Sequence, residues 1–95
     1  ANYSIYSAAK AGLEAITKGL ARELAPEIKV NAIAPGAMLE PPDVTWTEEQ
    51  KNKVIDTIPL KRMGSEKDIA ETVKFLAVSD YITGQIIKVD GGRSL

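Results

Sequence analysis

The sequence contains neither cysteine nor histidine. The absence of cysteine excludes disulfide bridges and thiolate metal sites, and it is consistent with a cytoplasmic location. Without histidine, the chain holds no Ser-His or Cys-His nucleophilic pair of its own. We therefore expect no metal site and look for chemistry that uses other side chains.

An excess of one charge and long apolar runs are also missing. Twelve basic and 13 acidic residues give a net charge of −1, so we expect neither nucleic acid nor a membrane as a partner. No run reaches the roughly 18 apolar residues of a membrane-spanning helix, and no signal peptide is visible. The 95 residues, 44% of them hydrophobic, suffice for one small globular domain.

The first part of the chain has the apolar pattern of a helix. Apolar residues recur at steps of three and four, which predicts a helix from about Ser4 or Ile5 to about Leu24. Ser4 is a candidate N-cap, and Pro26 ends the helix because the residue before a proline is pushed out of helical geometry. The apolar stripe consists of Tyr6, Ala9, Leu13, Ile16, Leu20 and Leu24.

Tyr6 and Lys10 are four residues apart in this helix and therefore share one face. An isolated tyrosine has a pKa of about 10, and a nearby cation favours the phenolate. The phenol then becomes a better proton donor and acceptor at neutral pH, so the pair is a candidate for acid/base catalysis. The alternative is a half-buried tyrosine beside a solvated lysine, because this spacing often occurs by chance.

A short strand is expected after the helix. Residues 28–33 alternate in the manner of a strand that stops at a turn containing Pro35 and Gly36. Residues 37–46 show no periodicity and form either a lid over a site or an ordinary connection. In α/β sheets ligands bind outside the carboxyl ends of strands, which is where Pro35 and Gly36 would fall.

Two helices and a strand complete the predicted order. Thr47 opens a capping box for a short helix that Pro59 ends. Ser65 caps a further helix that ends near Ser79, and residues 85–90 form the last strand. The order helix, strand, helix, helix, strand is typical of an α/β sheet.

Several tracts, in this order and at these intervals, resemble the C-terminal part of a short-chain dehydrogenase/reductase. The resemblance implies an α/β fold, with residues 1–95 forming the C-terminal portion of a doubly wound, Rossmann-type parallel-sheet domain. The tracts are Tyr6-x-x-x-Lys10, residues 30–36, Pro59-Leu60-x-Arg62-x-Gly64, Thr83-Gly84-Gln85 and Val89-Asp90-Gly91-Gly92.

The resemblance also implies a chemistry: NAD(P)-dependent redox at a carbonyl, an alcohol or an activated double bond of a small molecule. Tyr6 would be the general acid/base, and Lys10 would bind the nicotinamide ribose and lower the pKa of the phenol. Pro35 and Gly36 would line the nicotinamide pocket. The resemblance favours NADP over NAD and implies a homo-oligomer, because family members commonly form dimers and tetramers.

The sequence departs from the family pattern in three places. It has no glycine-rich phosphate loop, and the family's catalytic serine has no counterpart, since Ser4 and Ser7 lie too close to Tyr6. Where many members carry a threonine after Pro-Gly, this chain has Glu40. Because the chain also begins with Ala1, we expect a processed chain or a piece that lacks the glycine-rich N-terminal half. Such a piece would be inactive alone, and its exposed apolar surface would keep it bound to the missing N-terminal half or make it self-associate or aggregate.

Two further tracts bear on the substrate. Residues 34–39 with Pro41 and Pro42, and the ending at 89–95, resemble pteridine reductases and bacterial dihydropterin reductases. That likeness implies a pterin and NADPH. The rivals within the family are a 3-oxoacyl carrier-protein reductase and a sugar-alcohol dehydrogenase. In another class, the chain would be a non-catalytic assembly fragment whose helices only build subunit contacts.

Overall fold

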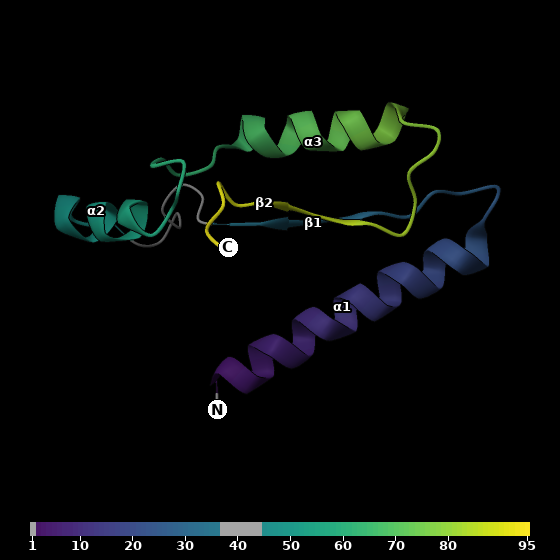
Figure 1. The fold of residues 1–95 in the computed structure, drawn as a ribbon, viewed down its shortest axis with the longest axis horizontal. Coiled ribbons are helices and arrows are strands. Elements are labelled where there is room, and N and C mark those ends of the chain that lie inside the picture. The colour runs from purple at the N-terminus through teal and green to yellow at the C-terminus, as the bar shows by residue number, and fades with distance from the viewer. Residues whose placement is uncertain (1, 37–44) are drawn as a thin grey trace. The chain divides into compact units, whose positions relative to one another are not determined.

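The computed structural model describes residues 2–36 and 45–95. Its elements follow the predicted order of helix, strand, helix, helix, strand (Figure 1). Residues 37–44, expected to be a lid or connection, lie outside the described residues. The elements are α1 (Asn2–Leu24), β1 (Ala32–Pro35), α2 (Glu48–Asp56), α3 (Glu66–Val78) and β2 (Ile86–Val89).

The two strands pair in a two-stranded parallel sheet. The Ala32 N–H donates to the Gln85 carbonyl oxygen, and the Gly36 N–H donates to that of Val89, both at 2.9 Å. Both donors precede their acceptors by the same number of residues, which is the register of a parallel pair. The carboxyl ends of β1 and β2 therefore meet at one edge.

The chain divides into two compact units, which are described separately. The first unit comprises Ala1–Ala32 and Leu76–Ile87. The second unit comprises Ile33–Phe75 and Lys88–Leu95. The carboxyl ends of both strands, with Pro35 and Gly36, belong to the second unit.

In the first unit, α1 begins at Asn2, so Ser4 lies inside the helix and its prediction as N-cap is wrong. The helix ends at Leu24, two residues before Pro26, as predicted. Its buried positions are Thr17 and Ala21. A Cβ built on Gly84 would stand 3.4 Å from the Ala21 Cβ, so small residues let the backbone at Gly84 approach the helix.

The first strand lies later than the predicted residues 28–33. Before β1, hydrogen bonds that involve side chains join the two segments in place of backbone ladder bonds. Asn31 Nδ2 donates to the Ile82 carbonyl oxygen at 3.1 Å, and Asn31 Oδ1 accepts from the Gln85 N–H at 3.0 Å. The Val30 N–H donates to Thr83 Oγ1 at 3.0 Å. Pro35 has no N–H to donate to the sheet. The strand nevertheless extends to Pro35, because the next hydrogen bond between the strands is donated by the N–H of Gly36.

Lys29 ties the same segment to the end of α3. Its Nζ donates to the carbonyl oxygens of Leu76, Ala77 and Ser79. A helix leaves its last carbonyl groups without intrahelical partners, and a lysine is a favourable donor to them. The cation therefore caps α3 from a distant part of the chain.

In the second unit, α2 starts with the predicted capping box. Thr47 Oγ1 accepts from the Gln50 N–H at 3.1 Å, and Gln50 Oε1 accepts from the Thr47 N–H at 2.8 Å. The helix ends at Asp56, before Pro59, because the chain turns there to bury Ile58, which is 1% exposed. Ser65 precedes α3 as predicted.

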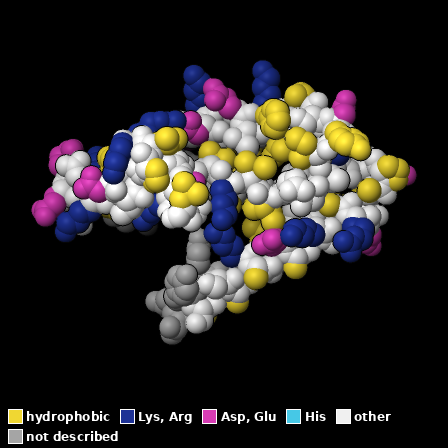
Figure 2. All heavy atoms as spheres, in the orientation of Figure 1, with side chains coloured by type: hydrophobic (Ala, Val, Ile, Leu, Met, Phe, Trp, Pro, Cys, Tyr) yellow, Lys and Arg dark blue, Asp and Glu magenta, His cyan; other side chains and the backbone are white. Residues whose placement is uncertain are grey.

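Many large apolar side chains remain at the surface, and Figure 2 shows hydrophobic side chains exposed on the visible face. They include four on α1 and three on α3. These side chains are Ile5, Leu13, Ile16 and Leu20, and Val73, Phe75 and Val78. The expectation of exposed apolar surface is therefore confirmed.

Candidate functional site

The helix α1 carries both predicted catalytic residues. Tyr6 and Lys10 are four residues apart within Asn2–Leu24, so the backbone places them on one face, about one turn from each other. Lys10 is exposed. The helical spacing on which the acid/base hypothesis depends is thus present in the first unit.

The second unit holds the other predicted pair at the carboxyl end of β1. Pro35 is exposed and Gly36 is half-buried. A Cβ on Gly36 would stand 2.5 Å from the Cβ and 2.6 Å from the Cα of Asp90. Asp90 therefore packs against the Gly36 backbone and leaves no room there for a side chain.

Asp90 in turn organises the loop after β2. Its carboxylate accepts from the Gly92 N–H at 3.0 Å and from the Ser94 N–H at 3.2 Å. Hydrogen bonds from the side chain of Ser94 and the backbone of Gly92 lower the pKa of Asp90. Gly91 and Gly92 have φ of 62° and 90°, a region in which glycine is strongly favoured.

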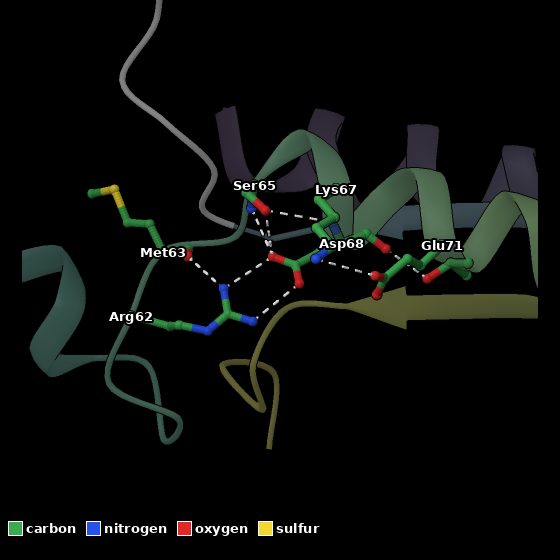
Figure 3. A network of polar contacts seen from close by, with 7 residues as sticks. Arg62, Met63, Ser65, Lys67, Asp68 and Glu71 are labelled. Atoms are coloured by element: carbon green, nitrogen blue, oxygen red, sulfur yellow. Dashed lines mark hydrogen bonds and ion pairs between the residues drawn. The ribbon is translucent and has the colours of Figure 1, made fainter.

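Asp68, near the start of α3, is the centre of a polar network in this unit (Figure 3). Arg62 binds it with both terminal nitrogens, Nη1 to Oδ2 at 2.9 Å and Nη2 to Oδ1 at 3.0 Å. The Ser65 N–H donates to Oδ2 at 2.8 Å and the Ser65 hydroxyl donates at 3.1 Å. The Asp68 N–H donates back to Ser65 Oγ at 3.4 Å, so serine and aspartate cap α3 reciprocally.

These contacts keep the Arg62–Asp68 pair ionised. The hydrogen bond from Arg62, followed by that from the Ser65 backbone, holds the pKa of Asp68 well below its usual range. The hydrogen bond to Asp68 also raises the pKa of Arg62. Because the carboxyl pKa falls on folding, the pair's contribution to stability is complete above about pH 4 and is lost as the pH falls through the lowered value.

The sequence patterns assigned no individual role to Lys29, Asn31, Arg62 or Asp90. The last three only lie within tracts that resemble the family. The spacing Ser65-x-x-Asp68 did signal a helix start. The partner of Asp68 could not be read from spacing, because Arg62 reaches it only through the turn between α2 and α3.

Within residues 2–36 and 45–95, no cluster of three or more acidic side chains is arranged to hold a metal ion. Of the helices in the same ranges, none has the length and apolar character to cross a membrane.

Comparison with known proteins gives the family. Residues 1–94 match the family model described as enoyl-(acyl carrier protein) reductase. The chain is 44% identical to the glucose 1-dehydrogenase of Gluconobacter oxydans over 99% of its own length and 37% of the relative's. It is 48% identical to a 3-oxoacyl-(acyl-carrier-protein) reductase of Staphylococcus epidermidis, over 92% of this chain and 37% of the relative. The chain is also 45% identical to carbonyl reductase family member 4 of Danio rerio, over 100% of this chain and 39% of the relative.

Solved structures agree with the sequence match. A small-chain dehydrogenase in complex with NADPH superposes with a TM-score of 0.83 and 36% identity, covering 98% of this chain and 44% of that one. A short-chain dehydrogenase from Leptospira borgpetersenii with bound NAD+ gives a TM-score of 0.81 and 37% identity, covering 96% of this chain and 35% of that one. The fold is therefore the C-terminal part of the Rossmann-type α/β domain seen in these dehydrogenases.

The chain belongs to the short-chain dehydrogenase/reductase family. It spans about two-fifths of the length of the relatives it matches.

Proposed function

We propose that the full protein is an NAD(P)(H)-dependent oxidoreductase. These residues would form the C-terminal portion of a single Rossmann-type domain whose glycine-rich half lies elsewhere in that protein. Family membership over residues 1–94 carries the proposal, and the helical spacing of Tyr6 and Lys10 supports it. The relatives crystallised with NADPH and with NAD+ support a nicotinamide cofactor, of which we favour NADP.

In the proposed mechanism, Tyr6 gives its hydroxyl proton to the substrate oxygen as the hydride arrives at carbon, and solvent returns the proton. The nicotinamide, when bound, supplies that hydride. Lys10 would bind the ribose of the cofactor and would favour the phenolate of Tyr6. At the strand end, the Gly36 N–H already donates to the Val89 carbonyl oxygen, so we assign the contact with a nicotinamide to the exposed ring of Pro35, with Gly36 beside it.

For the substrate, the named relatives support a 3-oxoacyl thioester or a sugar. The pterin hypothesis rests on the likeness of residues 34–39 and 89–95 alone, and the relatives reported above give it no support. The full-length protein should therefore be assayed with acetoacetyl-coenzyme A, with glucose and with a dihydropterin, each with both cofactors. We expect turnover of the thioester with NADPH.

The decisive variant is Tyr6→Phe in the full-length protein, which removes only the hydroxyl. We expect kcat to fall by about 10²- to 10⁴-fold, the usual contribution of a positioned proton donor. Tyr81→Phe is the matched control, because Tyr81 is fully exposed and outside the proposed site. Full activity in Tyr6→Phe would contradict the mechanism and favour the assembly fragment instead.

A further inference from the structure

The helix α2 belongs to the same unit as the carboxyl ends of the strands. The segment that follows it contacts the loop after β2: the Leu60 N–H donates to the Gly91 carbonyl oxygen at 3.0 Å. Ligands of α/β sheets bind outside the carboxyl ends of the strands. Within this unit, Figure 1 shows α2 on the side of the sheet where the strands end.

None of the nine residues of α2 is fully buried, although Lys51, Val54 and Ile55 are half-buried. The connector that follows the helix, residues 57–65, joins it to the rest of the second unit. One anchor of this connector is Ile58, which is buried and lies close enough to Gly91 that a Cβ there would meet its Cγ2 at 2.7 Å. The other is Arg62, which binds Asp68 of α3 and donates to the Met63 carbonyl oxygen at 3.0 Å.

The chain between these anchors turns sharply. Lys61 has a φ of 58°, the left-handed region, and its N–H donates to the Ile58 carbonyl oxygen at 2.8 Å. Lys61 Nζ also donates to the carbonyl oxygen of Asp56 at 3.0 Å, at the end of α2. A non-glycine residue persists in this conformation only where its surroundings hold it there. The two hydrogen bonds of Lys61 and the bidentate bond of the next residue, Arg62, lie around this turn and can contribute to that restraint.

The solvent exposure of the Arg62–Asp68 pair indicates how much the pair adds to the stability of the fold. The Arg62 side chain is 60% exposed and that of Asp68 is 24% exposed. Exposed ion pairs contribute little to the free energy of unfolding. A bidentate arginine–carboxylate pair nevertheless fixes direction as well as distance. Its effect should therefore be seen in the placement of α2 more than in global stability.

We propose that Arg62 and Asp68 are positioning residues for the substrate side of the site, acting by holding the connector and thereby α2 beside the carboxyl ends of the strands. This inference rests on the proposed function, because it assumes that a substrate occupies this edge. Neither residue needs to contact the substrate. Their loss should weaken substrate binding while leaving the proton and hydride steps intact.

The test uses the full-length protein with three variants: Arg62→Ala, Asp68→Asn and Arg62→Lys. With acetoacetyl-coenzyme A as the probe, we expect Arg62→Ala and Asp68→Asn to raise KM about tenfold, with kcat and the Kd of NADPH within about twofold. Arg62→Lys keeps the positive charge but cannot make the bidentate contact. Its KM should therefore lie between that of the wild type and that of Arg62→Ala. The double variant should be no worse than the worse single one, because both remove the same contact.

The matched control is Lys67→Ala, which removes an ion pair to Glu71 on the same helix, with an N–O separation of 3.9 Å (Figure 3). It should leave KM unchanged. Amide hydrogen exchange supplies a readout independent of turnover: Arg62→Ala should accelerate exchange across residues 48–61, and Lys67→Ala should not.

Two results would overturn the inference. One is a lower Tm in Arg62→Ala with unchanged KM and unchanged exchange in residues 48–61, which would leave the pair a purely structural feature. The other is an equal rise in KM for the control. If the wild-type protein turned over no substrate, the proposed function would fail separately, and the exchange comparison would still decide whether Arg62 positions α2.

Discussion

The size of residue 36 is limited by the backbone of Asp90. Gly36→Ala would bring a Cβ to 2.6 Å from the Asp90 Cα, a distance that only a backbone shift can relieve. We expect the substitution to lower the free energy of unfolding of the full-length protein by about 1–3 kcal/mol, the usual cost of overpacking. Urea unfolding monitored by circular dichroism would measure it.

The control for that prediction is Gly19→Ala, in α1. A Cβ there meets no atom within 4 Å, and alanine is favoured over glycine in a helix by about 1 kcal/mol. This variant should be as stable as the wild type or slightly more so. Wild-type stability in Gly36→Ala would show that the strand end is looser than the contact with Asp90 implies.

For single residues, the sequence predicted only those relations that follow from the spacing of neighbouring residues along the chain. The four-residue step from Tyr6 to Lys10 becomes a shared helix face in any α-helix, so it needed no tertiary information. The pairing of Arg62 with Asp68 depends on a left-handed turn at Lys61, a residue type that rarely adopts that conformation. No local pattern announces that turn.

The short helix α2 has a capping box at its first turn. None of its residues is buried, so its capping box carries much of its stability. Thr47→Ala removes the oxygen that accepts from the Gln50 N–H, which should cost about 1 kcal/mol. We expect faster hydrogen exchange within α2 and little change in the global unfolding midpoint.

Thr47→Ser is the control for the cap, since its hydroxyl can accept the same hydrogen bond. It should restore wild-type exchange in α2. Equal exchange in Thr47→Ala and the wild type would mean that contacts elsewhere in the second unit, and not the cap, maintain the helix.

The elements also show where a pattern fails. Both capping sequences, at Thr47 and Ser65, were predicted because the atoms that satisfy the first turn lie three residues away. The bounds of β1 were not, because Asn31 and Thr83 side chains replace ladder bonds. Those partners are more than fifty residues apart in sequence, and apolar alternation gives no sign of them.

At the scale of the whole molecule, apolar exposure is the main physical feature. Parallel sheets are normally covered on both faces, and a two-stranded sheet is not stable by itself in water. The exposed side chains of α1 include Leu13 at 49% and Ile16 at 60%. The described residues therefore present surface that a further part of the protein or a second copy would bury.

We therefore predict that the 95 residues, expressed alone, will associate rather than remain monomeric. Sedimentation velocity should show oligomers or aggregates at micromolar concentrations, because exposed apolar clusters of this kind are buried on contact. Ile16→Glu should reduce the association by placing a charge in the apolar stripe. Arg22→Glu, on the charged side of the same helix, should not, although it also alters a charge. A stably folded monomer would mean that the exposed stripe on α1 needs no partner, and the oligomer expected of the full protein would then have to form elsewhere.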